Sequence, residues 1–88
     1  MLGPAVPPLS GLRSAFTLDC SGQLCPVPIL MTEEKLADLG FGEILEVVFT
    51  DPGARPDLLA WCKGTGQECL GFRDEKAKSF AYIKKVKA

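Results

Sequence analysis

Apolar and polar residues alternate with a period of two in some parts of this chain and follow a helical period in others. Residues 16–19 alternate and predict a short strand, which ends at a turn formed by Ser21 and Gly22. Residues 43–50 also alternate and predict a second strand. The apolar face of this second strand is expected to carry Leu45, Val47 and Phe49.

The segment between these two strands has the period of a helix, and we expect the helix to begin at Pro26 and to be capped by Gly40. A proline suits the first helical position because the N–H group that it lacks has no helical partner there. The stripe expected to face the core contains Ile29, Thr32, Leu36 and Leu39. The side chains expected to point to water are Glu33, Glu34 and Asp38.

A second helix is predicted over residues 56–63, with Gly64 to Gly66 at its end. Its apolar side is expected to carry Leu58, Leu59 and Cys62. Residues 67–72 and 79–86 predict two further strands, which a polar turn at residues 73–78 would join as a hairpin. Two pairs of residues in the last strand compete for its buried face, namely Phe80 with Tyr82 and Ala81 with Ile83.

The predicted order is therefore strand, helix, strand, helix, strand, strand. Right-handed crossovers would place both helices on one face of a four-stranded mixed sheet, which is an α/β two-layer sandwich. We expect residues 15–88 to form this single domain. Residues 1–14 are rich in Pro and Gly and have no charge before Arg13, so they predict a flexible tail rather than a secretory signal.

Composition and charge narrow the functions that the chain could have. It has 88 residues, 47% of them apolar, with four Cys and no His. The absence of His excludes an imidazole base and any zinc site with imidazole ligands. The net charge of −1 gives no field that would attract nucleic acid or a membrane, and no apolar run is long enough to span a bilayer. We expect a cytoplasmic monomer with reduced thiols.

Basic residues are concentrated near the end of the chain. From residue 73 to residue 88 there are six basic residues and two acidic ones. They are interpreted as a solvated strand and tail or as a docking patch for an acidic partner protein. Nucleic-acid binding ranks third, because only Phe80 and Tyr82 are aromatic here. The residues proposed for such a patch are Arg73, Lys84 and Lys85.

Cys25 is the main candidate for chemistry, because it stands where the first strand passes into the first helix. A thiolate at the start of a helix is stabilised by the helix dipole and by free N–H groups, so we expect the pKa of Cys25 to be lowered. Pro26 and Pro28 lack N–H groups, which leaves Val27 and Ile29 as first-turn donors and should limit the lowering. The two prolines should also stiffen the loop around a nucleophilic sulfur.

The other three cysteines have weaker claims to chemistry. Cys62 lies on the apolar side of the second helix, and the face of Cys69 in its strand is undetermined. Cys20 could approach Cys25 as a disulfide partner or resolving thiol, although the spacing differs from the redox Cys-x-x-Cys pattern. The spacings of the four cysteines lack the paired arrangement of a zinc ribbon, so neither a metal nor a cofactor is expected.

These residues resemble the TusA/SirA-like sulfurtransferase family over about residues 16 to 85. The resemblance is carried by Leu18-Asp19, Gly22, Cys25-Pro26-Val27-Pro28, Asp51-Pro52 and Asp57. It implies a βαβαββ sandwich in which Asp19, Gly22 and the two prolines shape the loop that holds Cys25. Two positions depart from family members: Cys20 often has a non-thiol counterpart, and Leu24 replaces a basic residue found in some members.

The resemblance also implies a function for Cys25, which would accept sulfane sulfur as a persulfide and pass it to a protein thiol. The donor would be a cysteine desulfurase or a rhodanese-like protein, and the acceptor a DsrE-like or other protein. The pathways implied are tRNA thiolation, molybdenum cofactor synthesis or sulfur oxidation, and the chain would be a carrier rather than a stand-alone enzyme. Two alternatives remain open here, a regulatory interaction module and a dithiol redox protein that uses Cys20 and Cys25.

Overall fold

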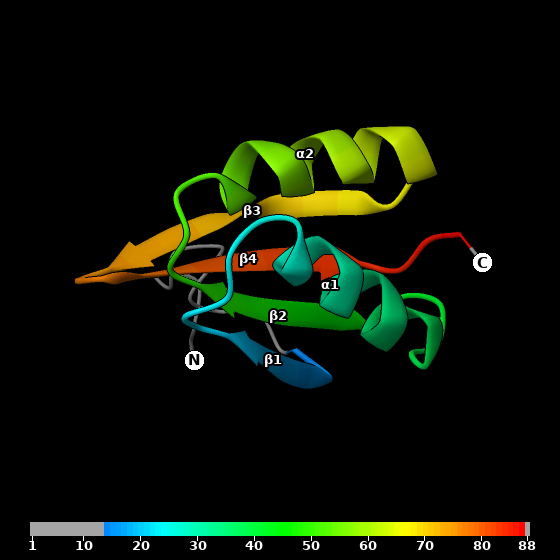
Figure 1. The fold of residues 1–88 in the computed structure, drawn as a ribbon. Helices are drawn as coiled ribbons and strands as arrows, with labels where there is room; N and C mark the ends of the chain where they lie inside the picture. Colours follow the sequence, from blue (N-terminus) through cyan, green and yellow to red (C-terminus); the bar gives the residue numbers. More distant parts are fainter. Residues whose placement is uncertain (1–13, 88) are drawn as a thin grey trace, which may run out of the picture.

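The computed structural model describes residues 14–87, and the order of its elements confirms the predicted one (Figure 1). The elements are β1 (Phe16–Cys20), α1 (Val27–Ala37), β2 (Ile44–Phe49), α2 (Ala54–Thr65), β3 (Glu68–Glu75) and β4 (Lys78–Lys84). The predicted flexible tail, apart from Ser14, lies outside the described residues.

The four strands form one mixed sheet in the order β1-β2-β4-β3. β1 and β2 are parallel, whereas β4 runs antiparallel to both β2 and β3. Both helices cover the same face of this sheet (Figure 1). Helix α1 is the crossover between β1 and β2, and α2 leads from β2 to the far edge of the sheet. The predicted two-layer sandwich is therefore confirmed.

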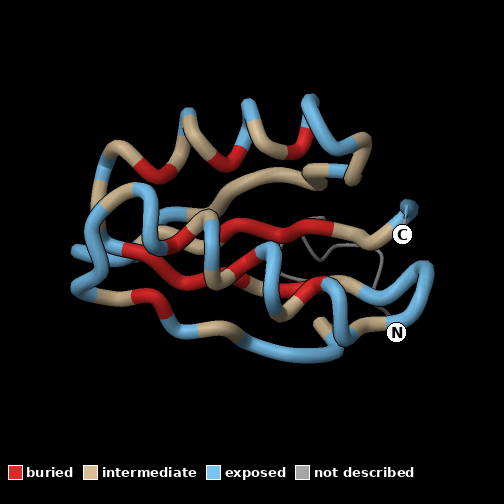
Figure 2. The backbone as a smooth tube through the Cα atoms, turned by 45° about the vertical axis from the view of Figure 1, so that its right-hand side comes forward, coloured by how far each residue is buried: buried red, intermediate tan, exposed pale blue. Residues whose placement is uncertain are grey.

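The core lies between the helices and the sheet, and Figure 2 shows the buried segments along β2, β4 and the inner sides of the helices. The predicted apolar face of β2 is confirmed, because Leu45, Val47 and Phe49 all belong to the core. In β4 the core face carries Ala81 and Ile83, which settles the ambiguity of the last strand. Two residues on the opposite face are also buried, since Val48 is 6% and Tyr82 3% exposed.

Helix α1 is shorter than the sequence predicts. Pro26 is the N-cap rather than the first helical residue, and the helix ends at Ala37 with Asp38 as its C-cap. The predicted cap at Gly40 is wrong. The chain leaves the α-helical pattern after Ala37, where the N–H group of Leu39 bonds the carbonyl of Leu36, three residues back, at 3.1 Å. The side-chain ammonium of Lys85 donates hydrogen bonds to the carbonyl oxygens of Ala37 at 3.3 Å and Leu39 at 2.7 Å. The predicted core stripe holds, with Thr32 and Leu36 buried and Ile29 and Leu39 packed against the core.

Helix α2 is longer than predicted, and two of its three predicted core residues, Leu58 and Cys62, are buried. Its buried residues are Ala54, Leu58 and Cys62, which are spaced by four and lie on one face. Leu59 is 43% exposed, so its predicted place on the core side is wrong. The helix ends at Thr65 and is capped by Gly66, whose φ of 84° is left-handed and whose N–H group bonds the carbonyl of Cys62 at 2.8 Å.

The hairpin between β3 and β4 has a shorter turn than predicted. Strand pairing continues to Glu75 and Lys78, so that only Lys76 and Ala77 form the turn, with Lys76 at a φ of 53°. The pairing of β3 with β4 shifts between Cys69 and Gly71, which is a β-bulge. Neither helix of residues 14–87 is long and apolar enough to cross a membrane.

Candidate functional site

Cys25 lies in the loop between β1 and α1. This loop and the one that follows β2 lie at the same end of the sheet (Figure 1). The carboxyl ends of parallel strands are where open α/β sheets place their sites. The backbone N–H group of Cys25 donates a hydrogen bond of 2.8 Å to Oδ2 of Asp51 in the second loop. Oδ1 of Asp51 accepts a longer bond of 3.4 Å from the N–H group of Gly53. One carboxylate thus joins the two loops.

A second carboxylate contacts the sulfur itself. Asp57 lies in the first turn of α2, and its Oδ2 accepts the hydrogen bond of the Cys25 thiol. This bond is the main reason why the pKa of Cys25 is raised to about 11, and desolvation and the charges of Asp57 and Asp51 raise it further. The lowered pKa predicted for Cys25 is therefore wrong, and the empty site holds a neutral thiol at physiological pH.

The first turn of α1 does not lower the pKa of Cys25, because its backbone N–H groups already donate to carbonyl oxygens. The N–H group of Val27 bonds the carbonyl of Leu24 at 2.9 Å, and that of Ile29 bonds the carbonyl of Pro26 at 3.0 Å. Neither of the donors predicted from the sequence is therefore left for a thiolate. Pro28, the other proline of the motif, is buried in the first turn of α1.

The remaining motif residues shape the loop before Cys25. Oδ1 of Asp19 accepts the N–H group of Ser21 at 2.9 Å, and hydrogen bonds from Ser21 lower the pKa of Asp19. Gly22 has a φ of 80°, in the left-handed region that favours glycine, and its N–H group bonds Oγ1 of Thr50 at 2.9 Å. The turn after β1 is thus also tied to the end of β2.

The other three cysteines are placed differently from Cys25. Cys20 is fully buried at the end of β1, and burial raises its pKa. Cys62 of α2 and Cys69 of β3 share the core, and the contact between their thiols raises the pKa of Cys62 and lowers that of Cys69 to about 7. All four thiols are free, and pairing of Cys20 with Cys25 stays a prediction. No group of acidic or Cys side chains in residues 14–87 is arranged to hold a metal ion.

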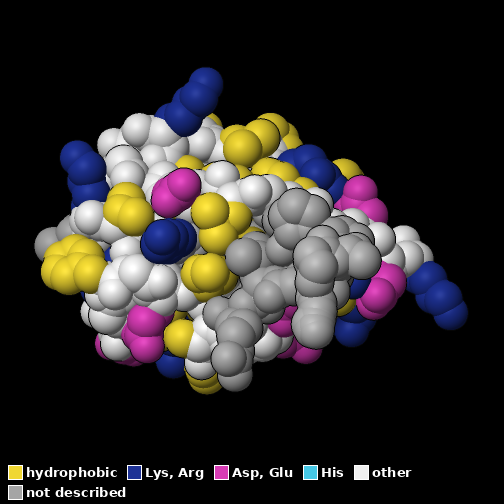
Figure 3. Space-filling model, turned by 180° about the vertical axis from the view of Figure 1, so that it is seen from behind, with side chains coloured by type: hydrophobic (Ala, Val, Ile, Leu, Met, Phe, Trp, Pro, Cys, Tyr) yellow, Lys and Arg dark blue, Asp and Glu magenta, His cyan; other side chains and the backbone are white. Residues whose placement is uncertain are grey.

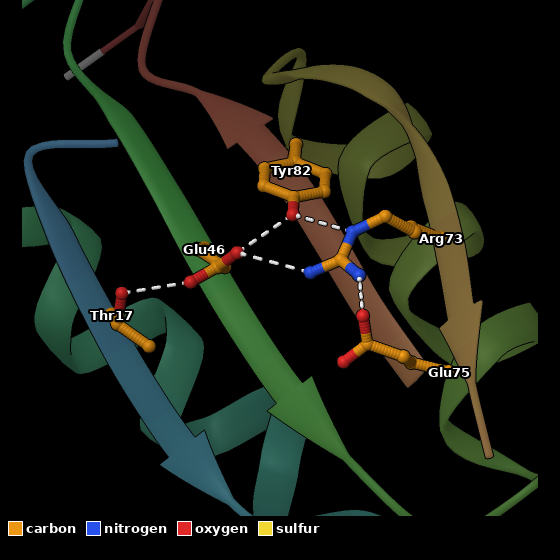
Figure 4. A network of polar contacts seen from close by, with 5 residues as sticks. All are labelled: Thr17, Glu46, Arg73, Glu75 and Tyr82. Carbon is orange, nitrogen blue, oxygen red and sulfur yellow. Dashed lines mark hydrogen bonds and ion pairs between the residues drawn. The ribbon is translucent and has the colours of Figure 1, made fainter. Parts of the chain in front are cut away.

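Of the basic residues proposed for a docking patch, Arg73 contacts other parts of the sheet (Figure 4). Its guanidinium donates hydrogen bonds to Tyr82 at 3.3 Å and Glu75 at 2.8 Å and lies 3.9 Å from Glu46. The ammonium group of Lys85 donates a hydrogen bond to the carbonyl of Leu39, just after α1. Lys84 is half-buried in β4, where it lies opposite Ile44 of β2 and Glu68 of β3. Seen from behind, the molecule carries charges of both signs among apolar side chains (Figure 3).

Two features of this site were not predicted from the sequence. Asp51 and Asp57 belong to the motif that carries the family resemblance, but their contacts with Cys25 join residues 26 and 32 positions apart. Two apolar side chains in this part of the chain are also exposed, namely Leu24, which precedes Cys25, at 71% and Leu30 of α1 at 57%. The helical period indicates that Leu30 lies off the core stripe, and this is the one signal that could have revealed the apolar surface.

The profile of the family described as Sulfurtransferase TusA matches residues 16–85, nearly all of the described chain. The chain belongs to the TusA family. The sulfur carrier protein TusA of Allochromatium vinosum is 41% identical over 68 residues, which cover 77% of this chain and 90% of that protein. A crystal structure of a SirA-like protein from Desulfitobacterium hafniense has the same fold, with a TM-score of 0.72 and 24% identity over 82% of this chain and 99% of that one.

Some TusA relatives are much longer than this chain. A protein of Aquifex aeolicus that is provisionally named a sulfur carrier is 44% identical over 78 residues, or 89% of this chain and 40% of the relative. A Bacillus subtilis protein with a similar provisional name is 44% identical over 64 residues, or 73% of this chain and 35% of the relative. The chain therefore spans less than half the length of these two relatives.

Proposed function

We propose that this chain is a sulfur carrier that accepts sulfane sulfur as a persulfide on Cys25 and transfers it to an acceptor protein thiol. The observation that carries the proposal is the placement of the four thiols. Cys20 and Cys62 are buried and Cys69 lies within a strand that faces the core, whereas Cys25 stands on a loop at the end of the sheet. A carrier needs one nucleophilic sulfur that other proteins can reach.

The exchange conserves atoms and electrons, so it needs no cofactor. The sulfur of Cys25 attacks the terminal sulfur of a donor persulfide, which forms a new S–S bond and breaks the S–S bond of the donor. The donor leaves as a thiol that takes up the proton lost from Cys25. Transfer to the acceptor is the same step with the roles exchanged. No oxidant is consumed, because one thiol and one persulfide stand on each side.

The partners are proteins that present a persulfide or a thiol at their surface. We propose a cysteine desulfurase or rhodanese-like protein as donor and a DsrE-like protein as acceptor, with the chain acting as a monomer. The exposed side chains of Leu24, which precedes Cys25, and of Leu30 in α1 offer such partners apolar surface. We place the exchange in the cytoplasm, where thiols stay reduced.

Intact-mass spectrometry tests the site of loading. The protein is incubated with inorganic polysulfide, separated from it and weighed, and we expect the wild type to gain about one sulfur atom. Cys25→Ser should gain none, whereas Cys69→Ser is the matched control and should load as the wild type does. Equal loading of Cys25→Ser and wild type contradicts the proposal.

A further inference from the structure

The contact between Cys25 and Asp57 depends on a single hydrogen atom. A thiol has one hydrogen, and in the empty protein Cys25 uses it in the bond to Oδ2 of Asp57. The backbone of Cys25 is meanwhile fixed separately, by its N–H bond to Asp51. The sulfur can therefore lose its bond to α2 while the loop stays in place.

Loading with sulfur removes that hydrogen. In a persulfide the inner sulfur is bonded to Cβ and to the outer sulfur, about 2.05 Å away, and carries no hydrogen. The proton or negative charge then belongs to the outer sulfur. Asp57 loses its donor, and the charges of Asp51 and Asp57 repel an anionic outer sulfur.

We propose that Asp57 is a positioning residue that distinguishes the empty carrier from the loaded one, holding the Cys25 thiol when it is empty and releasing it when it carries sulfur. The proposal rests on the proposed function, since it concerns the regulation of the same site. It predicts that free Cys25 is shielded from unspecific electrophiles and that the outer sulfur of the persulfide is not.

The charged groups around the site support this difference in reactivity between empty Cys25 and the outer sulfur of its persulfide. Arg55 is close to Asp57 along α2, but its guanidinium is paired with Asp74 and lies 4.6 Å from the centre of the Phe72 ring. It is therefore directed to β3 and not to Cys25. Asp51 and Asp57 are the two charges that act on the pKa of Cys25, and both raise it. No cation of residues 14–87 opposes them there.

Alkylation kinetics test the proposal directly. The rate of iodoacetamide alkylation of Cys25 is measured between pH 7 and pH 10 by peptide mass spectrometry, for wild type, Asp57→Asn and the exposed control Asp38→Asn. In the empty protein the apparent pKa of Cys25 should fall in Asp57→Asn from about 11 toward its usual 8.5, which raises the rate at pH 8 by about tenfold or more. Asp38→Asn should match the wild type.

The loaded protein gives the second half of the test. After treatment with polysulfide, Asp57→Asn should change the alkylation rate of the outer sulfur far less than it changes that of empty Cys25, because the inner sulfur no longer has a hydrogen for Asp57 to accept. Equal rates for the two empty proteins overturn the proposal, and so does an equal acceleration in the empty and loaded states. If Asp57→Asn does not fold, the wild-type profile decides, because an apparent pKa of 8.5 or below for empty Cys25 also overturns it.

The two proposals fail in different ways. A chain that takes up no sulfur contradicts the carrier function, yet its empty state can still show the effect of Asp57 on Cys25 alkylation. If the protein takes up sulfur on Cys25, but empty Cys25 is alkylated at the same rate in wild type and Asp57→Asn, the protein is a carrier and Asp57 is not a positioning residue.

Discussion

The N–H group of Cys25 donates a hydrogen bond of 2.8 Å to Oδ2 of Asp51, and this bond joins the two loops at the carboxyl end of the sheet. The sulfur of Cys25 is therefore positioned by a residue 26 positions further along the chain. The placement of the thiol depends on the packing of β1 beside β2 as much as on the prolines that follow it.

Replacing Asp51 by Ala should destabilise the protein. The change leaves the part-buried N–H group of Cys25 without its charged acceptor, which costs about 1 to 3 kcal/mol of the free energy of unfolding. Urea unfolding of wild type, Asp51→Ala and the exposed control Asp38→Ala measures the effect, and the control should change by less than about 0.5 kcal/mol. Equal losses in the two variants would show that the bond to Cys25 does not stabilise the fold.

Tyr82 is the only tyrosine of the chain, so its ionisation can be followed by absorbance. Burial raises the pKa of Tyr82, and so does its hydrogen bond of 2.6 Å to Glu46. A raised folded-state pKa contributes stability that is present below the unfolded value, about 10, and is lost as the pH rises through the folded value. We expect an absorbance midpoint above 10 in the native protein and a lower one in Glu46→Gln. A native midpoint at or below 10 contradicts the role of burial.

Local patterns were sufficient to predict the order of elements and most of the core. The alternation of Leu45, Val47 and Phe49 and the stripe through Thr32 and Leu36 depend on neighbours in the sequence, and both are found in the structure. The position of Cys25 between β1 and α1 follows from the same local signals.

The properties that the sequence missed depend on contacts between distant residues. The pKa of Cys25 is raised because Asp57, 32 positions away, accepts the thiol hydrogen, and the donors that would have lowered it are bonded to carbonyl groups. Lys85, from beyond β4, donates hydrogen bonds to the carbonyl groups of Ala37, at the end of α1, and Leu39, just after it. The periodic pattern of apolar residues within one helix or strand does not predict such contacts between distant segments.

Neighbouring leucines of α2 should respond very differently to truncation. Leu58 is fully buried, and Leu58→Ala should cost about 2 to 5 kcal/mol because it leaves a cavity in the core. Leu59 is 43% exposed, and Leu59→Ala should cost less than about 1 kcal/mol. Urea unfolding of both variants compares the two sides of the helix directly. Similar losses would contradict the orientation of α2.

Two glycines at the end of α2 should have opposite effects when replaced by Ala. Gly66 has a φ of 84°, and an added Cβ would lie 2.7 Å from Cδ of Lys87, so Gly66→Ala should destabilise by about 1 kcal/mol. Gly64 lies inside the helix with nothing within 4 Å of an added Cβ, and Gly64→Ala should stabilise by about 0.5 to 1 kcal/mol. Thermal unfolding measures whether each variant is more or less stable than the wild type. A stabilised Gly66→Ala would disprove the left-handed cap.

Whether Cys25 accepts sulfur and passes it on to another thiol is tested most directly by following one sulfur atom through both steps. The wild-type protein is loaded with polysulfide, freed of the donor and incubated with glutathione, and peptide mass spectrometry locates the added sulfur before and after. We expect the sulfur to be first on the Cys25 peptide and then to leave it and appear as glutathione persulfide, with the Cys25 thiol restored. Sulfur that is found on the peptides of other cysteines, or that stays on Cys25 in the presence of excess thiol, contradicts this expectation.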